Sequence, residues 1–200
     1  MAKETIIPYN DIRESLGTGD VLTCEQYDFF WRLIGHTAVV WKDPLTNMLS
    51  CFESTSISRV SGIKGVQLNP LGLWLDKYPG KVRVRQCQKL AGFEPKGKPE
   101  DFIQKYRGSS YPDTKTRAGR WKLILAAIDV EIFGHNIAAY HGKDKGIFCT
   151  ELVVMFLRHL GIMQEKGLPA WEYEPDDFTK RFINDQMCPL IVYGEQIRIK

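Results

Sequence analysis

The run Gly35-His-Thr-Ala-Val-Val-Trp41 and the run Met48-Leu-Ser-Cys-Phe-Glu53 decide the fold of this chain, together with the segment Asp43-Pro-Leu-Thr-Asn47 between them. Both runs are rich in β-branched and aromatic residues, and the segment between them has the composition of a turn with proline at its second position. The pattern predicts a β-hairpin. His36 and Glu53 are equally far from its centre, so without a bulge they are expected to lie directly opposite each other, with Cβ atoms about 4.5–5.5 Å apart.

The periodicity of the remaining sequence predicts an α+β protein. Apolar residues at helical spacing indicate helices over residues 9–16, 25–33, 71–77, 99–106, 120–133, 149–160 and 176–182. Alternating or β-rich runs indicate further strands over residues 21–23, 66–68, 81–87, 189–193 and 196–200. Asn69 and Pro70 are expected to cap the helix over 71–77. This order of elements, without an internal repeat or a long linker, predicts one domain over residues 1–200, with a largely antiparallel sheet packed against helices.

Composition excludes several classes of protein. The 200 residues are 44% apolar and 26% charged, which is typical of a globular chain and not of a fibrous or disordered one. The longest apolar run has six residues, against the roughly 18 that a membrane span requires, and no apolar stretch follows Met1 as in a secretory signal. Five cysteines cannot all be paired, and together with the missing secretory signal this odd number favours a reducing compartment. A cytoplasmic location is therefore expected, with export by another route left open.

Charge gives a weaker indication of partners. The net charge of +3 is too small to predict a nucleic-acid partner. Residues 81–120 nevertheless hold eleven Lys and Arg against four Asp and Glu, either as a solvated surface or as a surface for an anionic substrate or envelope polymer. His, Cys and carboxylate residues show no metal-ligand spacing, so we expect no metal and no cofactor.

Cys149 is the strongest candidate for chemistry. It is expected at the N-terminus of an apolar helix, where free N–H groups and the helix dipole lower the pKa of a thiol and can hold an oxyanion. The alternative is a small buried core residue. Among the four histidines, His36 has the best-placed partner, because Glu53 can hold one imidazole nitrogen and leave the other for a thiol. His135 and His141 are expected in loops, and His159 on the far end of the helix.

Four motifs in order resemble a known family. They are Gly19-Asp20-Val-Leu, Gly35-His36-Thr-Ala-Val-Val, Cys-Phe-Glu53 and Phe-Cys149-Thr-Glu-Leu-Val. Together, over about residues 17–193, they are similar to the circularly permuted branch of the NlpC-type papain-like cysteine hydrolase superfamily, the YiiX/YaeF-like group. In that branch the histidine precedes the cysteine, as it does in this chain.

The resemblance implies a papain-like fold and a role for each site residue. It makes Cys149 the nucleophile, His36 the base and Glu53 the residue that orients the imidazole, while Asp20 is expected to be a turn residue. The implied substrates are peptides, cell-wall peptides or lipid acyl groups, attacked at an amide, ester or thioester by a hydrolase or an acyltransferase. The alternative is a non-catalytic binding module whose groove and basic surface hold anionic lipid or cell-envelope polymer, with peripheral contact to the envelope.

Overall fold

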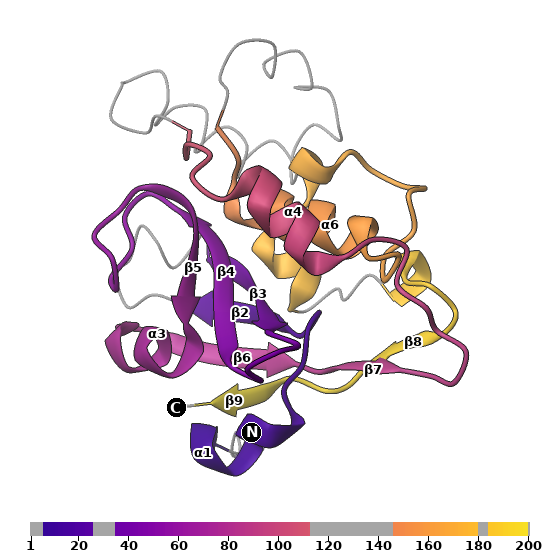
Figure 1. Cartoon of the computed structure of the whole chain (residues 1–200), viewed down its shortest axis with the longest axis horizontal. Helices are drawn as coiled ribbons and strands as arrows, with labels where there is room; N and C mark the ends of the chain where they lie inside the picture. Colours follow the sequence, from indigo (N-terminus) through magenta and orange to yellow (C-terminus); the bar gives the residue numbers. More distant parts are fainter. Residues whose placement is uncertain (1–5, 26–34, 113–145, 180–183, 200) are drawn as a thin grey trace.

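The computed structural model describes residues 6–25, 35–112, 146–179 and 184–199 (Figure 1). Its architecture is α+β, as the sequence predicts. The helices expected over 25–33 and 120–133 lie outside the described residues, apart from Glu25, which ends a strand. His135 and His141 are outside them as well.

Seven strands form the main sheet, in the order β1-β9-β6-β2-β3-β4-β5. Their bounds are β1 Ile6–Ile7, β2 Val21–Glu25, β3 His36–Lys42, β4 Leu49–Thr55, β5 Gly65–Pro70, β6 Lys81–Arg85 and β9 Ile197–Ile199. Only the β1–β9 pair is parallel among these described strands, so the sheet is largely antiparallel. The strand predicted over 81–87 divides at Gln86, because β7 Cys87–Lys89 leaves the sheet and pairs with β8 Ile191–Tyr193.

The described helices agree with the periodicity of the sequence. They are α1 Tyr9–Ile12, continued by a 3-10 turn over Arg13–Ser15, and then α3 Leu71–Lys77, α4 Pro99–Tyr106 and α6 Cys149–His159. Three further 3-10 turns cover Ala170–Glu172, Pro175–Phe178 and Asn184–Gln186. The helix expected from residue 176 is thus a short 3-10 turn in its described part, and residues 180–183 lie outside the described chain.

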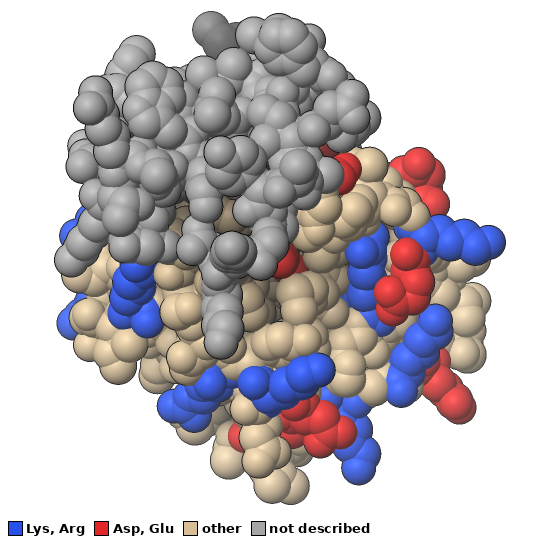
Figure 2. Space-filling model, turned by 90° about the horizontal axis from the view of Figure 1, so that it is seen from above, with Lys and Arg blue, Asp and Glu red and all other residues tan. Residues whose placement is uncertain are grey.

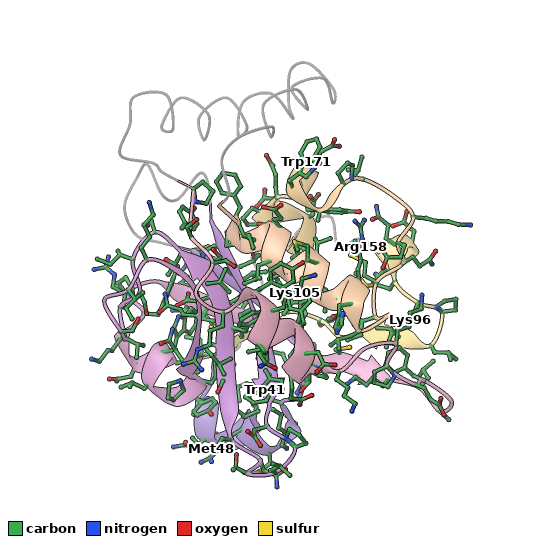
Figure 3. All side chains as sticks on the ribbon, turned by 45° about the horizontal axis from the view of Figure 1, so that its top comes forward. Trp41, Met48, Lys96, Lys105, Arg158 and Trp171 are labelled. Atoms are coloured by element: carbon green, nitrogen blue, oxygen red, sulfur yellow. The ribbon has the colours of Figure 1, made fainter. Side chains whose placement is uncertain are left out.

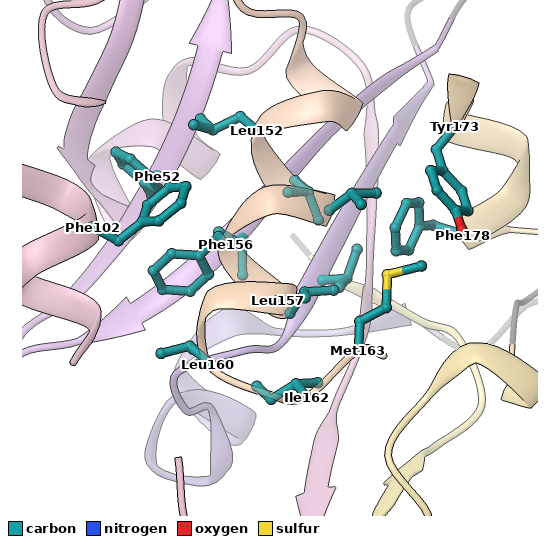
Figure 4. Packing of buried hydrophobic residues seen from close by; sticks show 14 of the residues in the cluster. Phe52, Phe102, Leu152, Phe156, Leu157, Leu160, Ile162, Met163, Tyr173 and Phe178 are labelled. Atoms are coloured by element: carbon teal, nitrogen blue, oxygen red, sulfur yellow. The ribbon is translucent and has the colours of Figure 1, made fainter. Parts of the chain in front are cut away.

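Each face of the sheet carries its own hydrophobic core. Helices α4 and α6 cover one face, where Phe52, Phe102 and Phe156 meet with ring centroids 5.4–6.2 Å apart (Figure 4). Helix α3 covers the opposite face. Along β3, Val39 belongs to the α6 core whereas Ala38 and Val40 belong to the α3 core, as expected for side chains that alternate in a strand. By the same alternation His36 is on the α3 side of the sheet.

The β3–β4 hairpin forms, but its register differs from the prediction by two residues. Val39 pairs with Phe52, and the chain turns through a four-residue loop closed by the Asp43 N–H to Met48 carbonyl bond of 2.9 Å. Asn47 in this loop has φ 57°, a left-handed conformation that asparagine adopts more readily than most residues. The expectation that His36 lies directly across from Glu53 is therefore wrong. The cause is the longer loop, because the symmetric pairing required a two-residue turn.

Candidate active site

Cys149 is the first residue of α6, where the sequence places it. The segment leading into the helix is fixed by β4, since the Ser54 hydroxyl donates to the Ile147 carbonyl at 2.5 Å. The Glu151 carboxylate accepts the N–H of Phe148 at 3.1 Å, which closes the first turn from within the helix. Cys149 itself is 9% exposed, so its thiol lies at the edge of the core.

His36 and Glu53 form a buried pair despite the shifted register. His36 Nε2 is 2.9 Å from Glu53 Oε2, and the two residues are 9% and 3% exposed. His36 also interacts with the Cys149 thiol and lowers its pKa, and Nδ1 is the ring nitrogen that remains for the sulfur. On the α3 side, the Tyr78 ring stacks near the imidazole with centroids 6.5 Å apart. The structure thus brings together the three residues that the sequence singles out.

The environment shifts the pKa values of this pair in opposite directions. For Cys149, burial raises the pKa, but the hydrogen bond and positive charge of His36 outweigh burial and lower it from 9.0 to about 7. For His36, burial lowers the pKa, but hydrogen bonds and charges from Cys149 and Glu53 raise it to about 10. Each shift stabilises the charged form of its group, so the thiolate–imidazolium pair is the favoured state between these two values.

Two threonines next to the pair support the sulfur, and sequence reasoning missed both. The backbone N–H of Thr37 lowers the pKa of the Cys149 thiol. The Thr37 hydroxyl donates to the Thr150 hydroxyl at 3.1 Å, and Thr150 Oγ1 is 3.8 Å from the sulfur. These contacts join β3 to α6. The sequence could have indicated these two threonines, because each directly follows a candidate site residue in the chain.

Asn69 has a different role from the expected helix cap. The residue before α3 is Pro70, and the helix has no side-chain cap. The Asn69 amide instead donates to Glu53 Oε1 at 3.1 Å and to the Ser58 hydroxyl at 3.3 Å. The prediction that Asn69 caps α3 is wrong, because its side chain points across the sheet from an inward position of β5. A polar residue at such a position was the signal that sequence reasoning could have used.

Tyr111 is a further neighbour of the thiol. Its ring meets that of Phe148 edge to face, with centroids 5.8 Å apart. Burial raises the pKa of the Tyr111 phenol, and the negative charge of Cys149 raises it further. A neutral phenol thus lies within electrostatic range of the sulfur.

Two other candidate residues lie away from this group. His159 ends α6 and its Nε2 contacts the Lys98 carbonyl at 2.9 Å. Asp20 is buried in the turn before β2, where its carboxylate accepts the N–H groups of Gly17 and Cys87 at 2.8 and 2.7 Å. This is the arrangement of a turn residue.

A surface hollow of about 430 Å³ also lies elsewhere, between α4 and the C-terminal half of α6. Its lining includes Lys105, Arg158 and His159 but none of the three site residues, and Figure 3 shows Lys105 and Arg158 on this side of the molecule. Within the described ranges, no three His, Cys, Asp or Glu side chains are arranged to hold a metal ion. None of the helices in those ranges is long and apolar enough to cross a membrane.

No family model matches the chain, and a search of curated proteins finds no match either. The geometry around Cys149 is therefore the basis for a function.

Proposed function

We propose that this chain is a cysteine hydrolase or acyltransferase of the permuted papain-like type, acting on an amide, ester or thioester through an acyl-enzyme. The observation that carries the proposal is the buried His36–Glu53 contact of 2.9 Å beside a helix-terminal thiol whose pKa is lowered to about 7. A structural cysteine in a core is expected to have a raised pKa, as burial gives to Cys24 and Cys51. Cys149 differs from them because His36 lowers its pKa, whereas for Cys24, which pairs across from His36, burial and the negative charges of Glu53 and Cys149 raise it.

The proposed reaction has two half-reactions. In the thiolate–imidazolium pair the proton of Cys149 is already on His36, and the thiolate attacks the substrate carbonyl carbon, whose C=O π electrons move onto oxygen. First-turn N–H groups of α6, which have no acceptor within a helix, stabilise this oxyanion. When the C=O bond re-forms, the amine, alcohol or thiol leaves and takes the proton from His36. Water, or another acceptor, then gives a proton to His36, attacks the thioester and releases the thiolate.

Glu53 serves both half-reactions through the same contact with His36. Its carboxylate holds Nε2, which leaves Nδ1 for the thiol and stabilises the imidazolium that forms in each step. The substrates that fit are the peptides, cell-wall peptides and lipid acyl groups expected from the sequence, since each offers a carbonyl with a leaving group.

The non-catalytic binding module receives less support from two of the described basic residues, Arg83 and Arg85. Arg83 donates to Glu25 at 2.5 Å, and Arg85 donates to the carbonyls of Phe178, Thr179 and Gly194. Figure 2 shows Lys and Arg beside Asp and Glu over one face of the described chain. Cations that are already engaged within the fold have less to offer a polyanion.

The test is intact-mass spectrometry of the purified protein after mixing with three acyl donors: a p-nitrophenyl ester, an acyl thioester and a peptide amide. We expect the wild type to gain the mass of the acyl group from at least one donor and to release product. Cys149→Ala should gain no mass, and His36→Ala should acylate more slowly. Equal turnover by wild type and Cys149→Ala would refute the proposal and favour the binding module.

A further inference from the structure

Glu53 uses both of its carboxylate oxygens. Oε2 contacts His36 Nε2 at 2.9 Å, while Oε1 accepts a hydrogen bond from the Asn69 amide at 3.1 Å. Glu53 and Asn69 are each 3% exposed, so these contacts are made in a nearly dry environment. A buried carboxylate with partners on both oxygens has one favoured orientation, because any rotation breaks at least one charge-assisted hydrogen bond.

Asn69 is itself held in place by the loop between β4 and β5. Its amide also donates to the Ser58 hydroxyl at 3.3 Å. Ser58 organises that loop, since its N–H donates to the Ile63 carbonyl and its carbonyl accepts from Gly62, both at 2.9 Å. The amide of Asn69 is thus fixed by two acceptors, one in the candidate site and one in the loop.

We propose that Asn69 is a positioning residue that aims the Glu53 carboxylate at His36 and thereby sustains the reactive thiolate of Cys149. This inference rests on the proposed function, to which it adds a residue that makes no contact with substrate. The physical sequence has three steps. Asn69 fixes Oε1, the fixed carboxylate stabilises the His36 imidazolium, and the imidazolium stabilises the thiolate.

Loss of the Asn69 amide should therefore raise the pKa of Cys149. The buried carboxylate then has one partner fewer and is free to turn away from Nε2. The imidazolium is less stable, and the pKa of Cys149 rises. We expect a shift of about one pH unit in the midpoint of Cys149 alkylation, which is a tenfold loss of thiolate well below that midpoint.

Gln67 provides a matched control on the same strand and the same face. It pairs directly across from Glu53 in the β4–β5 register, and it is 7% exposed. Its amide bonds to the Ile63 and Gly65 carbonyls and accepts from Ser61, and none of these bonds involves the carboxylate of Glu53. Asn69→Leu and Gln67→Leu each remove one buried amide, but only the first removes a partner of Glu53.

The experiment measures the rate of Cys149 alkylation by iodoacetamide against pH in wild type, Asn69→Leu, Gln67→Leu and His36→Ala. We expect the midpoint to rise in Asn69→Leu and in His36→Ala but to stay at the wild-type value in Gln67→Leu. Equal midpoints in Asn69→Leu and wild type, with a shift in His36→Ala, would overturn the positioning role and leave the proposed function intact. A wild-type midpoint at the ordinary thiol value would instead refute the proposed function.

A second measurement needs no variant and so stands even if Asn69→Leu does not fold. In the wild type, the chemical shifts of the Asn69 side-chain amide protons should change with pH, with the same midpoint as Cys149 alkylation. The reason is that ionisation of the Cys149–His36 pair changes the hydrogen bond between Glu53 and Asn69. The Gln67 amide protons should move much less. Asn69 signals that do not change through the alkylation midpoint would overturn the proposal.

Discussion

His36→Ala should remove most of the reactivity of Cys149 near neutral pH. In the wild type the pKa of this thiol is lowered from 9.0 to about 7, which corresponds to about 3 kcal/mol of thiolate stabilisation. The variant loses the hydrogen bond and the charge of His36 and keeps the burial, so the pKa returns to its ordinary value or above. At pH 7 the thiolate fraction then falls from about half to about one per cent, a loss of about 50-fold.

The observed rate falls by less than the thiolate fraction. A more basic thiolate is a better nucleophile, and a Brønsted slope of about 0.4–0.5 gives the variant an advantage of about eightfold for two pKa units. The net expectation is a decrease of about sixfold at pH 7. Above about pH 8 the order should reverse, with the variant reacting faster than the wild type.

The assay is iodoacetamide labelling from pH 5.5 to 10, with each cysteine followed by peptide mass spectrometry. Cys188 is half-buried and remote in sequence from the site, so its rate in the same samples controls for reagent and pH. Cys87 is also half-buried, but burial raises its pKa to about 11, so it should label slowly throughout the neutral range. A thermal unfolding curve for each variant verifies that the fold is retained.

One result would refute the reasoning. If wild-type Cys149 labels with a midpoint near 9, or if His36→Ala leaves a midpoint near 7 unchanged, then the imidazole does not stabilise the thiolate.

Four further changes have definite expected outcomes. Glu53→Gln should raise the Cys149 labelling midpoint, because the imidazolium loses its counter-charge; an unchanged midpoint would contradict the role of the carboxylate. Burial raises the pKa of Asp20 from 3.8 to about 6, so the folded state binds the Asp20 proton more tightly than the unfolded state does. The protonated carboxyl therefore contributes at most about 3 kcal/mol to the free energy of unfolding, and this contribution is lost as the pH rises from about 4 to 6. Urea unfolding of Asp20→Asn should show a weaker pH dependence than wild type, and parallel curves would count against this account. Phe156→Ala should lower the free energy of unfolding by about 3–5 kcal/mol in urea, since Phe156 is fully buried, and a loss below 1 kcal/mol would mean that the cavity collapses. Asn47→Val should cost about 1 kcal/mol in the same assay because of its φ of 57°, whereas Asn47→Gly should cost little; equal effects would rule out backbone strain.

The local elements could be predicted because their signals are local. Pro99 at the first helical position and the apolar spacing through Tyr106 define α4, and the predicted and observed bounds agree. The position of Cys149 at the start of α6 follows in the same way from the extended residues before it and the apolar helical spacing after it. These features depend on a few neighbouring residues, so one sequence is enough to find them.

The contacts around the site could not be predicted, because they depend on how distant strands pair. The inward position of Asn69 on its strand indicates a buried polar partner, but the neighbouring sequence does not identify that partner as Glu53. The pairing of the last strands is a similar case, since β8 joins β7 whereas β9 joins β6 and β1. A strand can pair along both of its edges, and its own residues do not determine which strand pairs with each edge.

The His36–Glu53 contact forms even though the predicted register of the hairpin was wrong. The observed register is shifted by two residues, and a shift of two keeps every side chain on its face of the sheet, whereas a shift of one would have put Glu53 in the α6 core. Extended to the start of β3, this register makes His36 and Glu53 diagonal neighbours, about 7–8 Å apart, a span that a long side chain crosses. A glutamate side chain is long enough to span this diagonal. The His36–Glu53 contact therefore requires that both residues lie on the same face of the sheet and that the carboxylate is on a long side chain, more than it requires that they pair directly across the ladder.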